Sequence, residues 1–470
     1  MRKTKIVCTI GPASSDEQTV KKLCLAGMNV ARMNFSHNTH KEHKQRIETV
    51  KRVSESLGLP VAIMLDTKGP EYRIGVFSEG SVQLYEGDGF VFTSDEVTGD
   101  KTRVSVSYKN LSHELSEGDT VLVNNGLMSF RVEAVDGADV RCVALTSGVL
   151  SDRKSMSFPG KVMRHEYLSD EDRADIALGV ELGVDFIACS FVSNAQNIRD
   201  VKEYLKSIGA EGIELIAKIE NGAGIENIES ICAECAGIMI GRGDMGVEIP
   251  FTQLPAIQKR IITKCRMLGK LVITATEMLE SMISNIRPTR AEISDVANAV
   301  FDGTSAVMLS GETAAGKYPV LATETMARIA EDAEANINYK KRFKNQDFSI
   351  ENTVDALSHA TCTMAIDVDA KAIAVCSLSG LTVRMVSRHR PFCDILGVVT
   401  DGRTFRQLSL SWGVTPALCE RIDSTDVLTH TAKELASEVL GLCRNDRIVI
   451  TAGVTNGKSG NSNMIKVETL

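Results

Sequence analysis

The sequence lacks several features that would assign it to large classes of protein. Its 470 residues include no apolar run of the about 20 residues that a membrane-spanning helix needs. It has no basic excess either, because 53 Lys and Arg stand against 61 Asp and Glu and the formal net charge is −8. Residues 1–8 lack the basic, apolar and small-residue order of a signal peptide. We therefore expect a cytoplasmic protein with neither a membrane nor a nucleic acid as its partner.

Aromatic residues and grouped cysteines are also scarce. The chain has one Trp, and its 12 Cys are scattered through apolar runs instead of forming a disulfide framework. Cys232 and Cys235 form a Cys-x-x-Cys without a second pair at metal-site spacing, which favours buried thiols over a zinc or redox site. The length predicts about three domains of about 150 residues each.

Eight short apolar runs, each followed by a turn and an amphipathic segment, predict the strands of a parallel sheet. These runs are residues 5–10, 28–35, 61–65, 185–190, 214–219, 238–240, 271–275 and 306–309. Eight such units fit an α/β fold of the (β/α)8 TIM barrel type.

Two further parts of the chain differ from the barrel pattern. Between the third and fourth strands, strand signals alternate with Gly and Asp turns, which predicts an inserted all-β lid domain. A polar stretch at 336–347 predicts a linker. The pattern after it, with four predicted strands at 372–376, 394–399, 447–452 and 464–467, predicts a C-terminal α/β domain. The predicted domains are residues 1–70 and 165–340 for the barrel, 71–164 for the lid and 350–470 for the C-terminal domain.

Polar residues at the carboxyl ends of the predicted barrel strands mark the candidate site, since catalytic groups of such barrels lie there. The period of two places Lys218 and Glu220 on one face of the fifth strand, where they either pair or hold a phosphate and its metal. Asp244 follows the sixth strand, and two carboxylates suit Mg²⁺. Alternatively, the polar residues at these strand ends only complete hydrogen-bonded turns or form solvent-exposed salt bridges. The other ends carry Arg32, Asn34, Ser36, Asp66, Thr67, Glu71, Arg73 and Thr276.

Two glycine motifs resemble nucleotide-binding signatures without completing them. Residues 241–246 read G-x-G-x-x-G, but they do not follow the first strand, where a dinucleotide-binding unit would carry them. Residues 311–317 nearly complete a P-loop, but Tyr318 replaces the Ser or Thr that would meet Mg²⁺. Neither motif predicts its usual ligand.

Taken together, these segments resemble the pyruvate kinase family over nearly the whole chain. The resemblance is carried by residues 5–12, 31–37, 65–71, 218–221, 241–250, 272–283, 287–299 and 308–311. It implies a barrel, an inserted lid and a C-terminal domain, and a homotetramer. It also implies phosphoryl transfer from phosphoenolpyruvate to ADP, giving pyruvate and ATP, with Mg²⁺ (or Mn²⁺) and K⁺ as cofactors.

The same resemblance implies a role for each site residue. Lys218 stabilises the transferring phosphoryl group, and Glu220 and Asp244 hold the divalent metal. Thr276 and the backbone amides of Gly243 and Asp244 bind the substrate carboxylate. The potassium ligands are Asn34, Ser36, Asp66 and Thr67, the phosphate and nucleotide contacts are Arg32 and Arg73, and Lys154 is a nucleotide-side residue of the lid.

Some positions depart from the family pattern or bear on regulation. Asn124 and Asn125 stand where members usually carry two Asp, and Glu277 replaces a usual Gln. Glu71 stands where potassium-independent members usually carry Lys, so we expect a requirement for potassium.

A loop of the C-terminal domain resembles the effector loop of the family. Ser377, Ser379 and Thr382 either hold an effector phosphate or form an ordinary strand-to-helix cap, with residues 456–460 as the opposite rim.

Two alternatives remain open from the sequence. A metal-dependent barrel lyase or aldolase acting on pyruvate or phosphoenolpyruvate would also use carboxylates with Lys and Arg to stabilise an enolate. A regulator with an inert barrel would use only the C-terminal domain. ADP-dependent turnover distinguishes all three.

Overall fold

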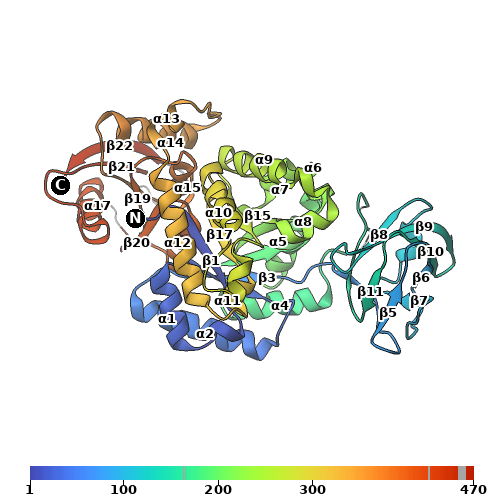
Figure 1. Ribbon diagram of the computed structural model, residues 1–470. Helices are drawn as coiled ribbons and strands as arrows, with labels where there is room; N and C mark the ends of the chain where they lie inside the picture. Colours follow the sequence, from blue (N-terminus) through green and yellow to red (C-terminus); the bar gives the residue numbers. More distant parts are fainter. Residues whose placement is uncertain (162, 165, 422–423, 454–461) are drawn as a thin grey trace.

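The computed structural model describes the chain apart from residues 162, 165, 422–423 and 454–461. It has three parts: a central barrel, a β-rich lid that projects from one side of it, and a C-terminal α/β unit on the opposite side (Figure 1). In the described part of the chain no helix is long and apolar enough to cross a membrane.

The eight predicted barrel strands are confirmed. They close into a parallel barrel in the order β1-β17-β16-β15-β14-β13-β3-β2. Their buried, β-branched runs pack inward on one another and outward on the surrounding helices. The strands are β1 (Lys5–Thr9), β2 (Val30–Asn34), β3 (Ala62–Asp66), β13 (Phe186–Cys189), β14 (Glu214–Ile219), β15 (Gly237–Gly241), β16 (Leu271–Ala275) and β17 (Ala306–Leu309).

Helices follow the barrel strands, and several begin at capping boxes. Thr39, Ser169 and Thr289 each cap a helix while an acidic residue three positions later bonds back to the cap. The helices are α1 (Glu17–Ala26), α2 (His40–Leu57), α4 (Asp170–Glu181), α5 (Ala195–Ser207), α6 (Gly222–Glu226), α7 (Ile228–Glu234), α8 (Arg242–Glu248), α9 (Leu254–Met267), α10 (Arg290–Asp302), α11 (Gly311–Ala314) and α12 (Pro319–Ala335).

The lid is a curled, mainly antiparallel β unit inserted after β3. Its larger sheet has the order β4-β12-β8-β9-β10-β6-β7, and β11 pairs with β5. Three phenylalanines, Phe90, Phe92 and Phe130, pack edge to face or tilted in its separate core. The elements are β4 (Tyr72–Arg73), β5 (Ser81–Leu84), β6 (Gly89–Thr93), β7 (Arg103–Ser105), α3 (Leu111–Glu114), β8 (Thr120–Val123), β9 (Met128–Asp136), β10 (Asp139–Ala144), β11 (Gly148–Ser151) and β12 (Ser155–Ser157).

The C-terminal unit is a five-stranded sheet in the order β20-β19-β18-β21-β22, with only β22 antiparallel. It contains the four predicted strands and one more, β20. Its elements are α14 (Thr353–Asp367), β18 (Ala372–Cys376), α15 (Leu381–Arg388), β19 (Asp394–Val399), α16 (Gly402–Gln407), β20 (Val414–Leu418), α17 (Thr425–Leu440), β21 (Arg447–Gly453) and β22 (Ser462–Thr469).

The segment predicted as a linker, 336–347, lies between α12 and α14 and contains a short helix, α13 (Tyr339–Lys344). The Asn338 side chain caps this helix by accepting from the Lys341 amide. Tyr339 and Phe343, four residues apart on one face, are buried, and the Tyr339 ring lies 5.4 Å from that of Trp412. Two aromatic residues are therefore enough to hold an otherwise polar segment as a helix.

Candidate active site

A cavity of about 180 Å³ lies at the carboxyl ends of the barrel strands, between the barrel and the base of the lid. Most of the residues predicted from the strand ends line it. These are Arg32, Asn34, Ser36, Glu71, Arg73, Lys218, Glu220, Asp244 and Thr276. Asp66 and Thr67 are buried beneath it.

Lys218 is the centre of a buried charge network. Its ammonium group lies 3.1 Å from Asp66, 3.2 Å from Glu220 and 2.7 Å from the Ser190 hydroxyl. Asp66 also accepts from the Arg32 guanidinium at 2.5 Å. Burial alone would lower the pKa of Lys218, but Asp66 and Glu220 outweigh burial and raise it. Lys218 is therefore a permanent cation at neutral pH.

Asp66 is an anion for a related reason. Its side chain is fully buried, which alone would raise its pKa, but Arg32 and Lys218 hold the pKa below its ordinary value. The network thus keeps two cations, Arg32 and Lys218, next to the cavity. A dianionic phosphoryl group is the kind of ligand that such a pair attracts.

Glu220 and Asp244 fit a divalent cation. Burial raises the pKa of Glu220 to about 7, and the neighbouring Asp244 adds to that rise although Lys218 opposes it. The Phe191 amide donates to one Glu220 oxygen at 2.8 Å. Among the described residues, no group of three or more His, Cys, Asp or Glu side chains is placed so that it could hold a metal ion by itself. Two carboxylates with open coordination positions are what Mg²⁺ uses when substrate and water complete its octahedron.

Helix α8, which contains Asp244, is hydrogen-bonded to Thr276 just after the end of β16. The Gly243 amide donates to the Thr276 hydroxyl at 2.9 Å, and the Arg242 guanidinium donates to the carbonyls of Ala275 and Thr276. Thr276 and Glu277 both have a positive φ, 65° and 54°. Such backbone costs about 1–3 kcal/mol per residue and occurs mainly where neighbours enforce it, often at functional sites. The Glu277 side chain itself is exposed.

The four residues predicted as potassium ligands lie close together. Asn34 and Asp66 are cross-strand partners in the β2–β3 pair, and the Asn34 side chain accepts from the Ser36 amide at 3.2 Å. The Thr67 hydroxyl accepts from the Ser190 amide at 3.2 Å. All four carry oxygen atoms, which are the donors that a hard cation requires.

The predicted nucleotide-side residues lie on the lid connections. Arg73, in β4, forms an ion pair with Glu71 at 2.5 Å and donates to the Arg153 carbonyl. Lys154 precedes β12, and its carbonyl accepts from the Ile74 amide. Its side chain does not line the cavity in this lid position.

The predicted effector loop lies far from this site, between β18 and α15. Thr382 is buried and its hydroxyl is 2.6 Å from that of Ser462. The Ser377 amide donates to the Val398 carbonyl, and Ser379 stands one residue before Gly380, which caps α15 with a φ of 74°. The predicted opposite rim, 456–460, lies outside the described residues.

Sequence reasoning missed Ser190, which joins three site residues. Its hydroxyl donates to Asp66 at 3.2 Å and to the Thr67 carbonyl at 2.7 Å, while Lys218 donates to it. The signal was present, because Ser190 is the polar end of the buried run 185–190. His37 also lines the cavity and was not singled out from the sequence.

Two family models match this chain. The pyruvate kinase barrel domain matches residues 1–323, and the pyruvate kinase alpha/beta domain matches residues 355–468. The chain belongs to the pyruvate kinase family. It is an enzyme with pyruvate kinase activity, which converts phosphoenolpyruvate and ADP to pyruvate and ATP in glycolysis. The lyase and inert-barrel alternatives are therefore set aside.

Individual pyruvate kinases resemble the chain over its full length. It is 43% identical over 470 residues to a pyruvate kinase of Clostridium acetobutylicum, with 100% of this chain and 99% of the relative covered. It is 45% identical to one of Staphylococcus saprophyticus, of which it covers 80%. A crystal structure of a pyruvate kinase from Cryptosporidium parvum matches with a TM-score of 0.94 at 35% identity, covering 100% of this chain and 96% of that one.

Proposed function

We propose that Lys218 and Arg32 stabilise the phosphoryl group in flight between phosphoenolpyruvate and ADP. The observation that carries this proposal is the buried network in which Lys218 stays protonated beside Asp66 and Glu220. A loose phosphoryl-transfer transition state spreads negative charge over its equatorial oxygens, so positioned cations do most of the work. The bond from phosphorus to the enol oxygen breaks, a bond to an ADP oxygen forms, and the enolpyruvate then takes a proton to become pyruvate.

Glu220 and Asp244 hold Mg²⁺ or Mn²⁺ in this proposal, and the metal supplies charge neutralisation on phosphoryl and enolate oxygens. The Thr276 hydroxyl and the amides of Gly243 and Asp244 bind the carboxylate of phosphoenolpyruvate. Helix α8 begins at these amides, which gives an anion favourable electrostatics.

Potassium binds Asn34, Ser36, Asp66 and Thr67, next to the phosphoryl position. Oxygen ligands converging from β2 and β3 support this role. Replacing K⁺ with tetramethylammonium, which is too large and too weakly coordinating for such a site, then abolishes turnover. An unchanged rate in tetramethylammonium would remove the potassium site from the proposal.

The nucleotide lies between the lid and the barrel, in contact with Arg73 and Lys154. Arg73 sits on the lid connection and lines the cavity, which supports its contact with the nucleotide. The contact of Lys154 requires the lid to close over the nucleotide. Ser377, Ser379 and Thr382 hold an effector phosphate at the start of α15. The enzyme works in the cytoplasm as a homotetramer, with domain boundaries at 70/71, 164/165 and 340/350.

The metal assignment is tested by titrating Mg²⁺ against activity in Glu220→Gln and Asp244→Asn. Each change removes the charge of a direct ligand, so the concentration of Mg²⁺ for half-maximal rate rises by at least the about 10–100-fold that loss of an outer-shell partner costs. Glu226→Gln, on the exposed surface of α6, is the matched control. Unchanged Mg²⁺ dependence in both site variants would contradict the assignment.

A further inference from the structure

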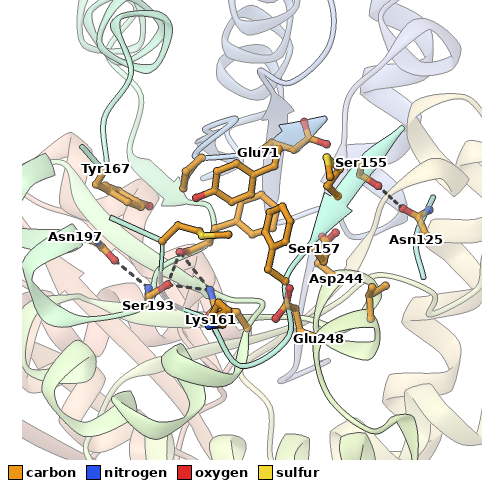
Figure 2. A pocket seen from close by; sticks show the side chains of 18 of the residues that line it. Glu71, Asn125, Ser155, Ser157, Lys161, Tyr167, Ser193, Asn197, Asp244 and Glu248 are labelled. Carbon is orange, nitrogen blue, oxygen red and sulfur yellow. Dashed lines mark hydrogen bonds between the residues drawn. The ribbon is translucent and has the colours of Figure 1, made fainter. Parts of the chain in front are cut away.

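A second cavity, of about 170 Å³, lies between the barrel and both lid connections. Figure 2 shows two of the pairs that its polar side chains form: Ser155 donates to Asn125 at 3.0 Å, and Asn197 accepts from the Ser193 amide, also at 3.0 Å. Among the described residues, no buried side-chain atom that lacks a hydrogen-bond partner belongs to the lining of this cavity. Unpaired buried donors gather elsewhere, where the barrel meets the C-terminal unit.

Three arginines from different elements form a cluster around Gly303, the residue that caps the end of α10. Arg266 lies in the last turn of α9, Arg342 lies in α13, and Arg390 comes two residues after α15. Nη1 of Arg266 and Nη2 of Arg342 lie 3.5 Å and 3.3 Å from the position that a Cβ of Gly303 would take, and Arg390 donates to the Gly303 carbonyl at 3.0 Å. Figure 1 shows α10 and α15 side by side at this junction. The arginine cluster therefore connects the barrel to the C-terminal unit.

The arginine cluster has no counter-ion of its own. In the described part of the chain, no carboxylate lies within ion-pair distance of its three guanidinium groups. Two carboxylates nearby pair with other cations, Asp302 with Lys259 and Asp355 with Arg388 at 3.2 Å. Arg342 donates instead to the backbone carbonyl of Asp302 at 3.2 Å. Three positive charges therefore lie together without compensation.

The cluster also presents buried donors that have no partner among the described residues. These are Nε and Nη1 of Arg266, Nε of Arg390 and the hydroxyl of Tyr339. Arg266 and Arg390 are each only 4% exposed. The Tyr339 ring and the Arg390 guanidinium both lie against Trp412, 5.4 Å and 5.0 Å from its ring centre. An unpaired buried donor is costly, above all on a charged group, so these donors point to a ligand that accepts from them.

The pKa values at the cluster reflect its positive charge. Burial lowers the pKa of Arg266 to about 10, and the charge of Arg342 adds to that fall. Burial also lowers the pKa of the neighbouring His389 to about 2, and repulsion from nearby arginines contributes further. His389 is therefore neutral, whereas a guanidinium keeps its proton in proteins. Neutralising the cluster takes an anion from solution.

We propose that the arginine cluster binds a small tetrahedral oxyanion of the phosphate class between the barrel and the C-terminal unit. Guanidinium groups bind such oxyanions through several charge-assisted hydrogen bonds. Donors that come from α9, from α13 and from the segment after α15 suit a ligand with several oxygen atoms better than a single halide ion. The site is separate from the candidate effector loop, because that loop precedes the first turn of α15 and the cluster follows its last turn. The bound anion stabilises the contact between the two domains.

The test follows thermal unfolding of the full chain in sodium gluconate, with sodium phosphate or sodium chloride added at equal ionic strength. Phosphate is expected to raise the melting temperature of the unaltered enzyme by about 2–4 °C, and that of Arg266→Met by less than about 1 °C. Without phosphate, Arg266→Met melts no lower than the unaltered enzyme, because the change removes an uncompensated buried charge. Lys264→Met is the matched control: it removes a cation of the same helix that already pairs with Glu229, and it keeps the response to phosphate.

Further variants locate the bound phosphate, since the catalytic cavity and the candidate effector loop also suit this ion. The rise in melting temperature persists in Lys218→Met and in Thr382→Val. Equilibrium dialysis with radiolabelled phosphate finds one more phosphate per chain in the unaltered enzyme than in Arg266→Met. Tyr339→Phe keeps the ring on Trp412 but loses the hydroxyl, and it weakens phosphate binding by about tenfold.

Three results would overturn the proposal. They are an equal response of Arg266→Met and the unaltered enzyme to phosphate, a response to chloride as large as the response to phosphate, and loss of the response in Lys218→Met or Thr382→Val. If Arg266→Met does not fold, Tyr339→Phe carries the test, and an unchanged affinity for phosphate in that variant overturns the proposal. None of these outcomes bears on the proposed catalytic roles, which turnover of Lys218→Met tests separately.

Discussion

Replacing Lys218 with Met is expected to abolish turnover while leaving the fold intact. Met has nearly the same length and volume as Lys but no charge, so the change removes the ammonium group and little else. In the structure that group lies 3.1 Å from Asp66 and 3.2 Å from Glu220, at the edge of the catalytic cavity. The variant therefore tests the cation alone.

The size of the effect follows from the charge that is lost. Removing one positioned donor from a transition state costs about 10²–10³ in kcat, and removing a cation on a transferring phosphoryl group costs about 10³–10⁵. We expect a fall of at least about 10³, or about 4 kcal/mol at 1.36 kcal/mol per factor of ten.

Folding suffers much less than catalysis. Asp66 keeps its ion pair with Arg32 at 2.5 Å and its hydrogen bond from Ser190. Glu220, whose pKa is already about 7, takes up a proton once Lys218 is gone. The free energy of unfolding therefore falls by less than the about 3–5 kcal/mol of a broken buried ion pair.

The assay follows pyruvate formation with saturating phosphoenolpyruvate and ADP, alongside thermal unfolding of the same samples. Lys202→Met is the matched control, because Lys202 pairs with Glu234 on the outer surface of the barrel. A kcat within about tenfold of the unaltered enzyme in Lys218→Met would refute the reasoning, since the cation would then supply less than about 1.4 kcal/mol of transition-state stabilisation.

Three other changes have defined outcomes. Glu71→Lys places a fixed cation at the cavity edge, so the dependence of the rate on K⁺ falls, and titration of the variant with KCl measures this. In metal-free enzyme the pKa of Glu220 rises from 4.5 to about 7 on folding, so the folded state holds this proton more tightly. Stability is then highest below the unfolded pKa and falls by up to about 3 kcal/mol as pH rises toward and through 7, and Mg²⁺ restores it; unfolding in urea at pH 5 and pH 8 tests the sign. Arg406→Ala leaves Asp185, fully buried and 2.9 Å away, without its charge partner, and lowers the free energy of unfolding by about 3–5 kcal/mol, which urea unfolding measures directly.

Much of the fold could be predicted because the barrel strands are buried on both faces and appear as continuous apolar runs. The missed strand β20 contains Pro416, which argues against a strand in an inner position. The structure places β20 at the edge of its sheet, where proline is tolerated. The lid pairings, such as the parallel contact of β6 with β7, join residues that no local pattern connects.

The part of the candidate site that lies at the strand ends could be predicted, because the period of two along a strand determines which side chains share a face. The spacing of Lys218 and Glu220 anticipated that they share a face, and the structure shows them paired. Ser190 was missed because its partners Asp66, Thr67 and Lys218 lie on other strands, far away in the sequence. The catalytic and ligand roles stay predictions.

The most direct test of the proposed phosphoryl transfer measures pyruvate and ATP together, from phosphoenolpyruvate and ADP with Mg²⁺, in K⁺ and in tetramethylammonium. Equal amounts of both products are expected in K⁺, and neither product is expected in tetramethylammonium or from Lys218→Met. Pyruvate without ATP, or full activity of Lys218→Met, would contradict it.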